Sequence, residues 1–96
     1  MPAVRRLLLV LSLGSNGALW MTAAAEGRIP APAVPVASGV GAGDSMVAGM
    51  LHRLLRGRDV GEAVRYGVAA AAASVMKPGT ALCLLEDVER LYAAIR

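Results

Sequence analysis

One stretch of the sequence, Ser38-Gly39-Val40-Gly41-Ala42-Gly43-Asp44-Ser45, marks the point at which the chain changes character. Before it the sequence is extended and spaced by prolines, and after it apolar residues recur at helical intervals. Its glycines permit positive φ and a close approach of the backbone to a ligand. The stretch therefore predicts a loop that turns directly into a helix.

This loop combines two groups that phosphoryl transfer requires. The first amides of a helix have no partner within the helix, and together with the helix dipole they favour an anion such as phosphate. Asp44 at the helix start would accept a proton from a hydroxyl nucleophile. The alternative is structural, because Asp also caps helices after glycine turns. The loop matches neither the P-loop nor the dinucleotide fingerprint, since it lacks their lysine ending and glycine spacing.

The first helix after the loop is predicted to begin near Gly43 and to end at Gly57. His52 and the neighbouring Arg53, Arg56 and Arg58 are expected to be solvated, the arginines around the helix end where cations suit the dipole. Apolar residues at helical spacing predict one buried face, made by Met46, Val47, Met50, Leu51, Leu54 and Leu55.

A second helix is predicted from Asp59, which forms a variant of the capping box with Glu62, to about Met76. Within it, Ala69 to Ala73 provides five successive small side chains, which allow a neighbouring backbone or a flat ligand to approach closely. A last helix is predicted over Glu86 to Ile95, with acidic residues in its first turn.

The first 26 residues allow two interpretations. A basic pair, an apolar run and a later alanine run, Arg5-Arg6, Leu7 to Leu11 and Ala23 to Ala25, have the layout of a secretory signal peptide. The apolar run is too short for a transmembrane helix. Alternatively, the segment forms strands and turns: a strand over Leu7 to Leu13, a turn over Gly14 to Gly17, a strand over Ala18 to Thr22, a turn at Glu26-Gly27, and an extended edge segment over Arg28 to Val36.

The composition indicates a folded chain that is one small domain or part of a larger one. Of its 96 residues, 56% are hydrophobic and 18% are charged, a composition that disfavours disorder. Phe is absent, so the core is built from small side chains, and part of the apolar surface is expected to pack against something else. Its ten Lys and Arg form no dense basic patch with aromatics, which disfavours nucleic-acid binding. Cys83 is the only cysteine, which excludes an internal disulfide. His52 is the only histidine, which excludes a His-based triad within this chain.

The sequence around the loop, from Ser38 to Gly49, resembles the second signature of the PfkB family of carbohydrate kinases. Three further blocks resemble that family in the same order: Ser12-Leu13-Gly14-Ser15-Asn16-Gly17-Ala18, Val64-Arg65-Tyr66-Gly67-Val68-Ala69-Ala70 and Gly79-Thr80-Ala81-Leu82-Cys83. Together the blocks cover nearly the whole chain, and they favour the phosphofructokinase branch. The resemblance also favours the strand interpretation of the N-terminal segment.

The resemblance implies the C-terminal portion of a ribokinase-like α/β sandwich, with strands first and then three helices. On that basis, residues 1–96 are the nucleotide-binding and catalytic part, without the lid and the sugar-binding half. The implied activity is ATP-dependent conversion of fructose 6-phosphate to fructose 1,6-bisphosphate, with the fragment alone expected to be inactive. Alternatives are a 1-phosphofructokinase, a tagatose 6-phosphate kinase, a non-catalytic nucleotide-binding remnant, or a small exported protein.

Residue roles follow from the same resemblance. Asp44 is implied as the general base that takes the proton of the sugar-phosphate hydroxyl. The implied anion hole is made by the amides of Gly41, Ala42 and Gly43. The implied ATP site comprises Ser12, Leu13, Gly14, Ser15, Asn16, Gly17 and Val40, with Val68 and Ala72 against the adenine.

Members of this family use Mg with ATP, and many hold a potassium ion beside the anion hole. The matching positions are Ser38, Val40, Ser74, Lys77, Gly79 and Ala81. Lys77 and Ala81 depart from the phosphofructokinase pattern, which has Asn and Arg there, and a Lys ammonium would repel a cation or replace it. The implied partners are ATP and a sugar phosphate, not nucleic acid or membrane, in a cytoplasmic enzyme whose full-length relatives are expected to be homodimers.

Overall fold

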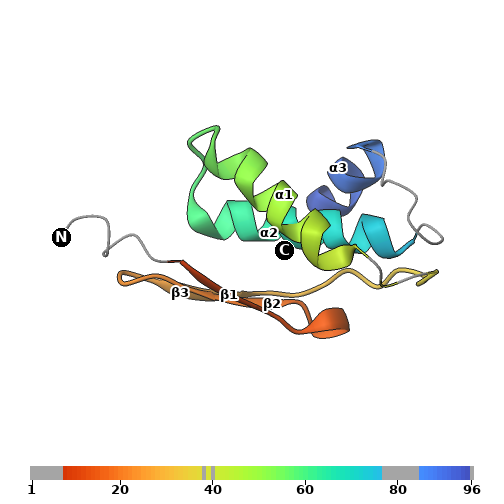
Figure 1. The fold of residues 1–96 in the computed structure, drawn as a ribbon, viewed down its shortest axis with the longest axis horizontal. Helices are drawn as coiled ribbons and strands as arrows, with labels where there is room; N and C mark the ends of the chain where they lie inside the picture. The colour runs from red at the N-terminus through yellow and green to blue at the C-terminus, as the bar shows by residue number, and fades with distance from the viewer. Residues whose placement is uncertain (1–7, 38, 40, 77–84, 96) are drawn as a thin grey trace.

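The computed structural model describes residues 8–37, 39, 41–76 and 85–95, which form a layer of strands beneath a layer of helices (Figure 1). The sheet comprises β1 (Leu9–Ser12), β2 (Ala18–Met21) and β3 (Glu26–Ile29), and a 3-10 turn, η2 (Gly14–Asn16), joins the first two strands. The helices are α1 (Ala42–Leu54), α2 (Val60–Val75) and α3 (Leu85–Ala94). The predicted order, strands first and then three helices, is confirmed.

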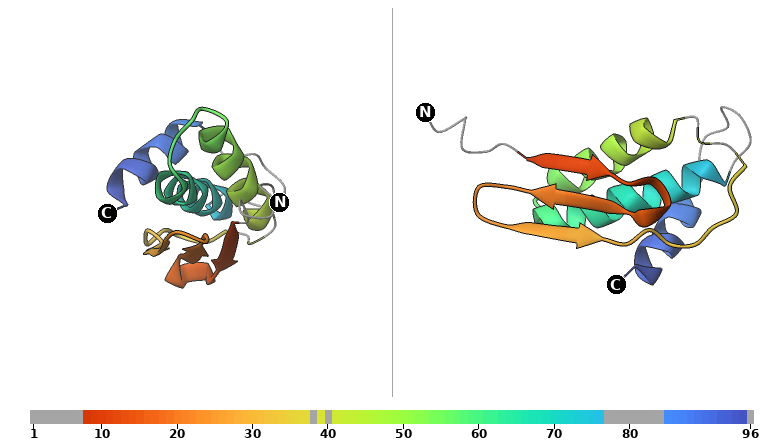
Figure 2. Two further views of the ribbon diagram at one scale, coloured as in Figure 1. Left: turned by 90° about the vertical axis from the view of Figure 1, so that its left-hand side faces the viewer. Right: turned by 90° about the horizontal axis from the view of Figure 1, so that it is seen from below.

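The strands pair in the order β1-β2-β3, and both pairs are antiparallel. Seen from its end, the molecule has its helices on one face of this sheet (Figure 2). Side chains alternate between the faces, so Val10, Ala18 and Trp20 point toward the helices and contribute to the core. The strand interpretation of the N-terminal segment is thus confirmed for β1 and β2.

The turn predicted at Glu26-Gly27 is wrong, because both residues belong to β3 and pair with β2. The chain reverses instead at residues 22–25, where the Thr22 amide donates to the Ala25 carbonyl over 2.7 Å. The Thr22 hydroxyl also accepts two backbone amides of this turn. Gly27 serves packing, since a Cβ on it would lie 2.5 Å from Nε1 of the Trp20 indole.

α1 and α2 cross where each helix carries a glycine. A Cβ on Gly49 would lie 3.2 Å from the Cα of Gly67, and a Cβ on Gly67 would lie 2.8 Å from the Met46 carbonyl oxygen. This crossing buries Met46 and Gly49 against α2. The predicted apolar face of α1 is therefore only partly correct, because three of its members are exposed, Val47, Leu51 and Leu55.

The predicted boundaries of the helices agree closely with the structure. Gly57 follows α1 with a φ of 77°, and Asp59 caps α2 by accepting the Glu62 amide over 2.9 Å. α3 begins and ends one residue before its predicted bounds, Glu86 and Ile95. Within the described ranges, no helix combines the length and apolarity needed to cross a membrane.

The expectation that His52 and Arg53 are solvated is wrong. The His52 ring stacks on Tyr66 with 5.5 Å between centroids, and the Arg53 guanidinium carbon lies 4.0 Å from the centroid of the same ring. The Arg53 side chain is only 14% exposed and approaches the Glu89 carboxylate to 3.6 Å. The cause is tertiary, because α2 places a buried aromatic ring under the end of α1, where a guanidinium gains a cation–π contact.

Gly67→Ala is expected to destabilise the chain. A methyl group there meets the fixed Met46 carbonyl, so overpacking costs about 1–3 kcal/mol, offset by up to about 1 kcal/mol of helix propensity. Urea unfolding measures the difference. Gly43→Ala is the matched control, because a Cβ on Gly43 meets nothing within 4 Å. Equal stability of the two variants would show that the crossing is not tightly packed.

Tyr66→Phe is expected to change how stability depends on pH. Burial raises the pKa of Tyr66 above its usual 10.0, and the hydrogen bond to Glu89 and the charge of that carboxylate raise it further. Because folding favours the protonated phenol, its contribution is complete below the unfolded-state pKa and is lost as pH rises through the folded-state value. Urea unfolding above about pH 10 should therefore show a shallower loss of stability in Tyr66→Phe than in the unsubstituted chain. Parallel profiles would contradict this assignment.

Candidate active site

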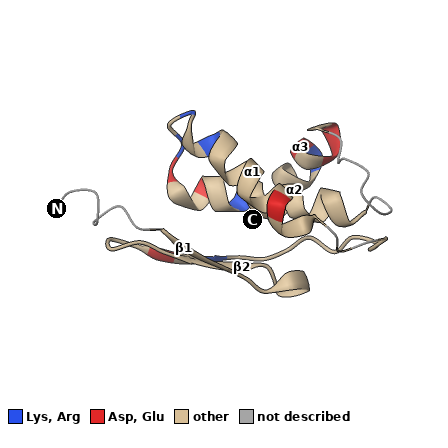
Figure 3. Ribbon diagram, viewed as in Figure 1, with Lys and Arg blue, Asp and Glu red and all other residues tan. Residues whose placement is uncertain are grey.

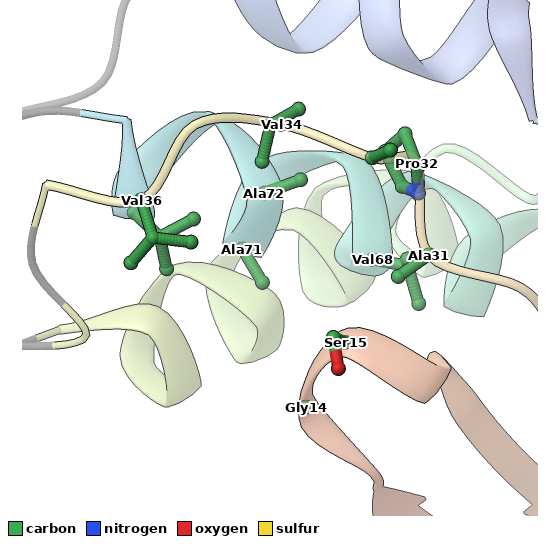
Figure 4. A pocket seen from close by; sticks show the side chains of 11 residues that line it. Gly14, Ser15, Ala31, Pro32, Val34, Val36, Val68, Ala71 and Ala72 are labelled. Atoms are coloured by element: carbon green, nitrogen blue, oxygen red, sulfur yellow. The ribbon is translucent and has the colours of Figure 1, made fainter.

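A cavity of about 440 Å³ lies between η2, the extended segment after β3, and α2 (Figure 4). None of the residues that line it is charged, and most are aliphatic, so it suits a flat, uncharged group better than a phosphate. Its lining is Gly14, Ser15, Ala31, Pro32, Ala33, Val34, Val36, Val68, Ala71, Ala72 and Val75.

A tight turn forms one wall of the cavity. The Leu13 amide donates to the Gly17 carbonyl over 2.7 Å, and the Gly17 amide donates to the Gly14 carbonyl over 3.0 Å. Gly14 has a φ of 60°, a conformation that favours glycine. This turn exposes Gly14 and Ser15 toward the cavity, whereas four other residues assigned to the ATP site from the sequence are not among its lining residues, Ser12, Leu13, Asn16 and Gly17.

One face of α2 forms the opposite wall. Val68, Ala71, Ala72 and Val75 recur at helical spacing and all line the cavity. The alanines between them, Ala69, Ala70 and Ala73, are buried in the core. The alanine run therefore lets elements pack closely, as predicted, and two of its members, Ala71 and Ala72, also line the cavity. The two residues predicted to lie against adenine, Val68 and Ala72, both line this cavity.

The segment after β3 forms a third wall, which the sequence did not predict. Only the first two residues of the predicted edge segment, Arg28 and Ile29, belong to a strand. The segment that follows β3 crosses below α2 and presents Pro32, Val34 and Val36 to the cavity. Its proline spacing was the available signal, because prolines keep a chain extended while withholding the amides that strand pairing needs.

The glycine-rich loop begins α1 as predicted. Gly41 occupies the N-cap position with a φ of 83°, and no side chain caps the helix. Asp44 lies exposed in the first turn, so the alternative in which it caps the helix is wrong. The amides of this first turn have no partners four residues earlier in the helix, although the Ala42 amide contacts the Gly39 carbonyl at 3.4 Å. A carboxylate and a set of amides therefore share one helix start.

The loop and the cavity lie at the same end of the molecule. A Cβ on Gly41 would lie 4.0 Å from Oγ of Ser74, which is next to the cavity-lining Val75 on α2. The Ala37 amide donates to the Val75 carbonyl over 2.7 Å and so fixes the chain just before the loop. The cavity thus lies near the start of α1.

The residues assigned to a potassium site are described only in part. Ser74 is buried beside the loop, whereas five positions lie outside the described residues, Ser38, Val40, Lys77, Gly79 and Ala81. Among the described residues, no group of three or more His, Cys, Asp or Glu could hold a metal ion.

Comparison with known proteins gives concordant findings. The model described as pfkB family carbohydrate kinase matches residues 4–87, which include every site residue named above. ATP-dependent 6-phosphofructokinase isozyme 2 of Mycobacterium tuberculosis (strain ATCC 25618 / H37Rv) is 47% identical over 85 residues, 88% of this chain and 25% of the relative. The 1-phosphofructokinase of Escherichia coli (strain K12) is 46% identical over 66 residues, 69% of this chain and 21% of the relative.

A solved structure agrees with the sequence relatives. The crystal structure of phosphofructokinase-2 from Escherichia coli in complex with potassium superposes with a TM-score of 0.86 at 40% identity, over 91% of this chain and 28% of that one. The arrangement of strands and helices is therefore that of ribokinase-like α/β kinases. The chain spans about a quarter of the length of the curated relatives it matches.

Proposed function

Because the chain belongs to the pfkB family of carbohydrate kinases, we propose that it supplies the nucleotide site and the general base for ATP-dependent phosphorylation of a sugar phosphate. One observation carries the proposal: an uncharged cavity between η2 and α2 lies near a helix start that presents first-turn amides and a carboxylate. In this proposal the adenine base lies in the cavity, and the phosphates and the reacting hydroxyl lie at the start of α1.

The adenine base of ATP occupies the cavity in this proposal. A purine is flat and uncharged, and the lining along α2 consists of Val68, Ala71, Ala72 and Val75, whose side chains are small and apolar. Gly14 and Ser15 bring backbone and hydroxyl groups to the rim, where polar parts of the nucleoside would lie. Larger side chains at the alanine positions would fill the space that the base needs.

The phosphoryl group is transferred at the start of α1. Asp44 accepts the proton of the sugar-phosphate hydroxyl as that oxygen attacks the γ-phosphorus, and the bond to the β-phosphate oxygen breaks to release ADP. The amides of Gly41, Ala42 and Gly43, with the positive end of the helix dipole, stabilise the negative charge on the transferring group. Gly41 at the N-cap has a φ of 83°, a conformation that favours glycine.

Metal ions take supporting roles. Mg²⁺ would accompany ATP and neutralise charge on its phosphate oxygens. Of the positions implied for potassium, the structure describes Ser74, whose hydroxyl lies near Gly41 and would offer one oxygen to such an ion. Such an ion would add positive charge near the helix start.

The sugar phosphate is fructose 6-phosphate in this proposal, by analogy with the 6-phosphofructokinase relatives. The 1-phosphofructokinase relative is comparably identical over a shorter match, so 1-phosphofructokinase or tagatose 6-phosphate kinase activity is the second candidate. The chain corresponds to about a quarter of either enzyme, so complete transfer requires the remaining polypeptide. Without it, the chain is a nucleotide-binding remnant.

Ala72→Leu is expected to weaken ATP binding at least about tenfold, because the larger side chain fills the cavity proposed for the base. Isothermal titration calorimetry with MgATP measures the affinity. Ala93→Leu makes the same change at an exposed position of α3 and should leave the affinity unaltered. Equal affinities of the two variants would place the nucleotide elsewhere, and no binding at millimolar MgATP would refute a nucleotide site in the isolated chain.

Asp44→Asn is expected to lower the transfer rate by about 10²–10⁴-fold, the usual contribution of a general base. The assay uses a chimaera in which this chain replaces the 85 aligned residues of the Mycobacterium tuberculosis relative, with ATP and fructose 6-phosphate. Glu86→Gln is the control, because Glu86 is an exposed carboxylate on α3, and this variant should retain full activity. An active chimaera that tolerates Asp44→Asn would remove Asp44 from the reaction.

A further inference from the structure

A second cavity, of about 430 Å³, lies between the sheet and the start of α2. It shares no lining residue with the cavity beside η2, and its wall contains charged residues of both signs. The lining is Trp20, Gly27, Arg28, Ile29, Asp59, Gly61, Glu62 and Arg65. Figure 3 shows both signs of charge around the turn between α1 and α2, whereas η2 carries none. The two cavities therefore suit ligands of different chemistry.

The Trp20 indole provides an apolar surface within this charged cavity. A Cβ on Gly61 would lie 3.4 Å from Cζ2 of the indole, and a Cβ on Gly27 would lie 2.5 Å from its Nε1. Because neither glycine has a side chain, the ring lies directly between β3 and the first turn of α2. Ile29 adds an aliphatic side chain to the same lining. An apolar part of a ligand would therefore contact aromatic and aliphatic surface here.

The two carboxylates of the charged cavity differ in how fully they are used. Oε1 of Glu62 accepts the Tyr92 hydroxyl over 2.7 Å and lies 3.9 Å from Nε of Arg58. Asp59 accepts the Glu62 amide at Oδ1 over 2.9 Å. An ionised carboxylate accepts hydrogen bonds at both oxygens, and Oδ2 of Asp59 has no partner among the described residues. Asp59 can therefore accept a hydrogen bond from a cationic group of a ligand.

The two arginines of the charged cavity differ in the same way. Nη2 of Arg65 donates to the Tyr92 hydroxyl over 3.0 Å, and its guanidinium carbon lies 4.5 Å from the centroid of that ring. The Arg28 side chain forms no hydrogen bond or ion pair with any residue that the structure describes. Arg28 is exposed on β3, at the edge of the described sheet, and lines the cavity from that edge. Because a guanidinium presents paired donors that match a carboxylate, Arg28 is the group best placed to bind one.

We propose that the charged cavity binds a zwitterionic α-amino acid with an apolar side chain. The carboxylate of the ligand pairs with Arg28, its ammonium group with Asp59, and its side chain packs on Trp20. The lining contains two arginines and two carboxylates, so it matches a ligand that carries both charges and is neutral overall. The same two carboxylates repel a multiply charged phosphate. The inference does not rest on the proposed function.

Intrinsic fluorescence reports on this cavity directly, because Trp20 is the only tryptophan of the chain. Titration of the full chain with L-phenylalanine, without nucleotide, should give a saturable change in the Trp20 emission. Arg28→Ala should weaken this binding at least about tenfold, because it removes a charge-assisted contact to the carboxylate. Arg90→Ala is the matched control, because Arg90 is exposed on α3 and does not line the cavity, and it should bind like the unsubstituted chain.

Asp59→Asn tests the second charge of the ligand. Asn caps a helix about as well as Asp, so the start of α2 is retained while the negative charge is removed. The variant should weaken binding of L-phenylalanine at least about threefold, because the contact to the ammonium group is no longer charge-assisted at the protein side. It should not weaken binding of hydrocinnamate, which is the same molecule without its ammonium group.

Four outcomes would overturn the proposal. They are the absence of a saturable change with L-phenylalanine up to its solubility limit, equal affinities of Arg28→Ala and Arg90→Ala, an equal loss of L-phenylalanine and hydrocinnamate binding in Asp59→Asn, and competition by MgATP, since the two cavities share no lining residue. Circular dichroism checks that the variants are folded, and Arg28→Gln repeats the test if Arg28→Ala is not. The titration requires neither nucleotide nor catalysis, so its failure leaves the proposed function to be judged separately.

Discussion

The close crossing of α1 and α2 is the constraint on which the rest of the structure depends. Gly49 and Gly67 let the helices approach until side chain and backbone are in contact, with Met46 packed at the crossing point. Because α1 begins at the glycine-rich loop, the crossing also decides where that loop lies relative to α2. A wider separation would move the Asp44 helix start away from the cavity that α2 lines.

α2 lies at the centre of the molecule and contacts α1, α3 and the sheet. Most of its alanines are buried in the core, and Val68, Ala71, Ala72 and Val75 also form a wall of the cavity. Small side chains make this dual use possible, since they bury little area individually but permit short distances between elements. As a result, the core contains few large side chains. The Tyr66 ring on α2 contacts His52 and Arg53 and so joins α1 to α2.

Some large apolar side chains also remain exposed. Large apolar side chains are exposed on the outer face of the sheet and along α1, and the chain spans about a quarter of its relatives' length. The low aromatic content noted in the sequence has the same physical meaning, because such a chain can bury only part of its apolar area internally.

The sequence by itself determined the order of elements, the caps at Asp59 and Gly57, and the helix that starts at the glycine-rich loop, because turn residues and helical spacing act locally. Its family resemblance also brought together Ser15, Val68 and Ala72, although they lie far apart in the chain. Only the tertiary structure decided the role of Gly27 beside Trp20, the burial of Arg53, and the cavity wall from Pro32 to Val36. Each of these depends on which element packs opposite, and local periodicity carries no information about that neighbour.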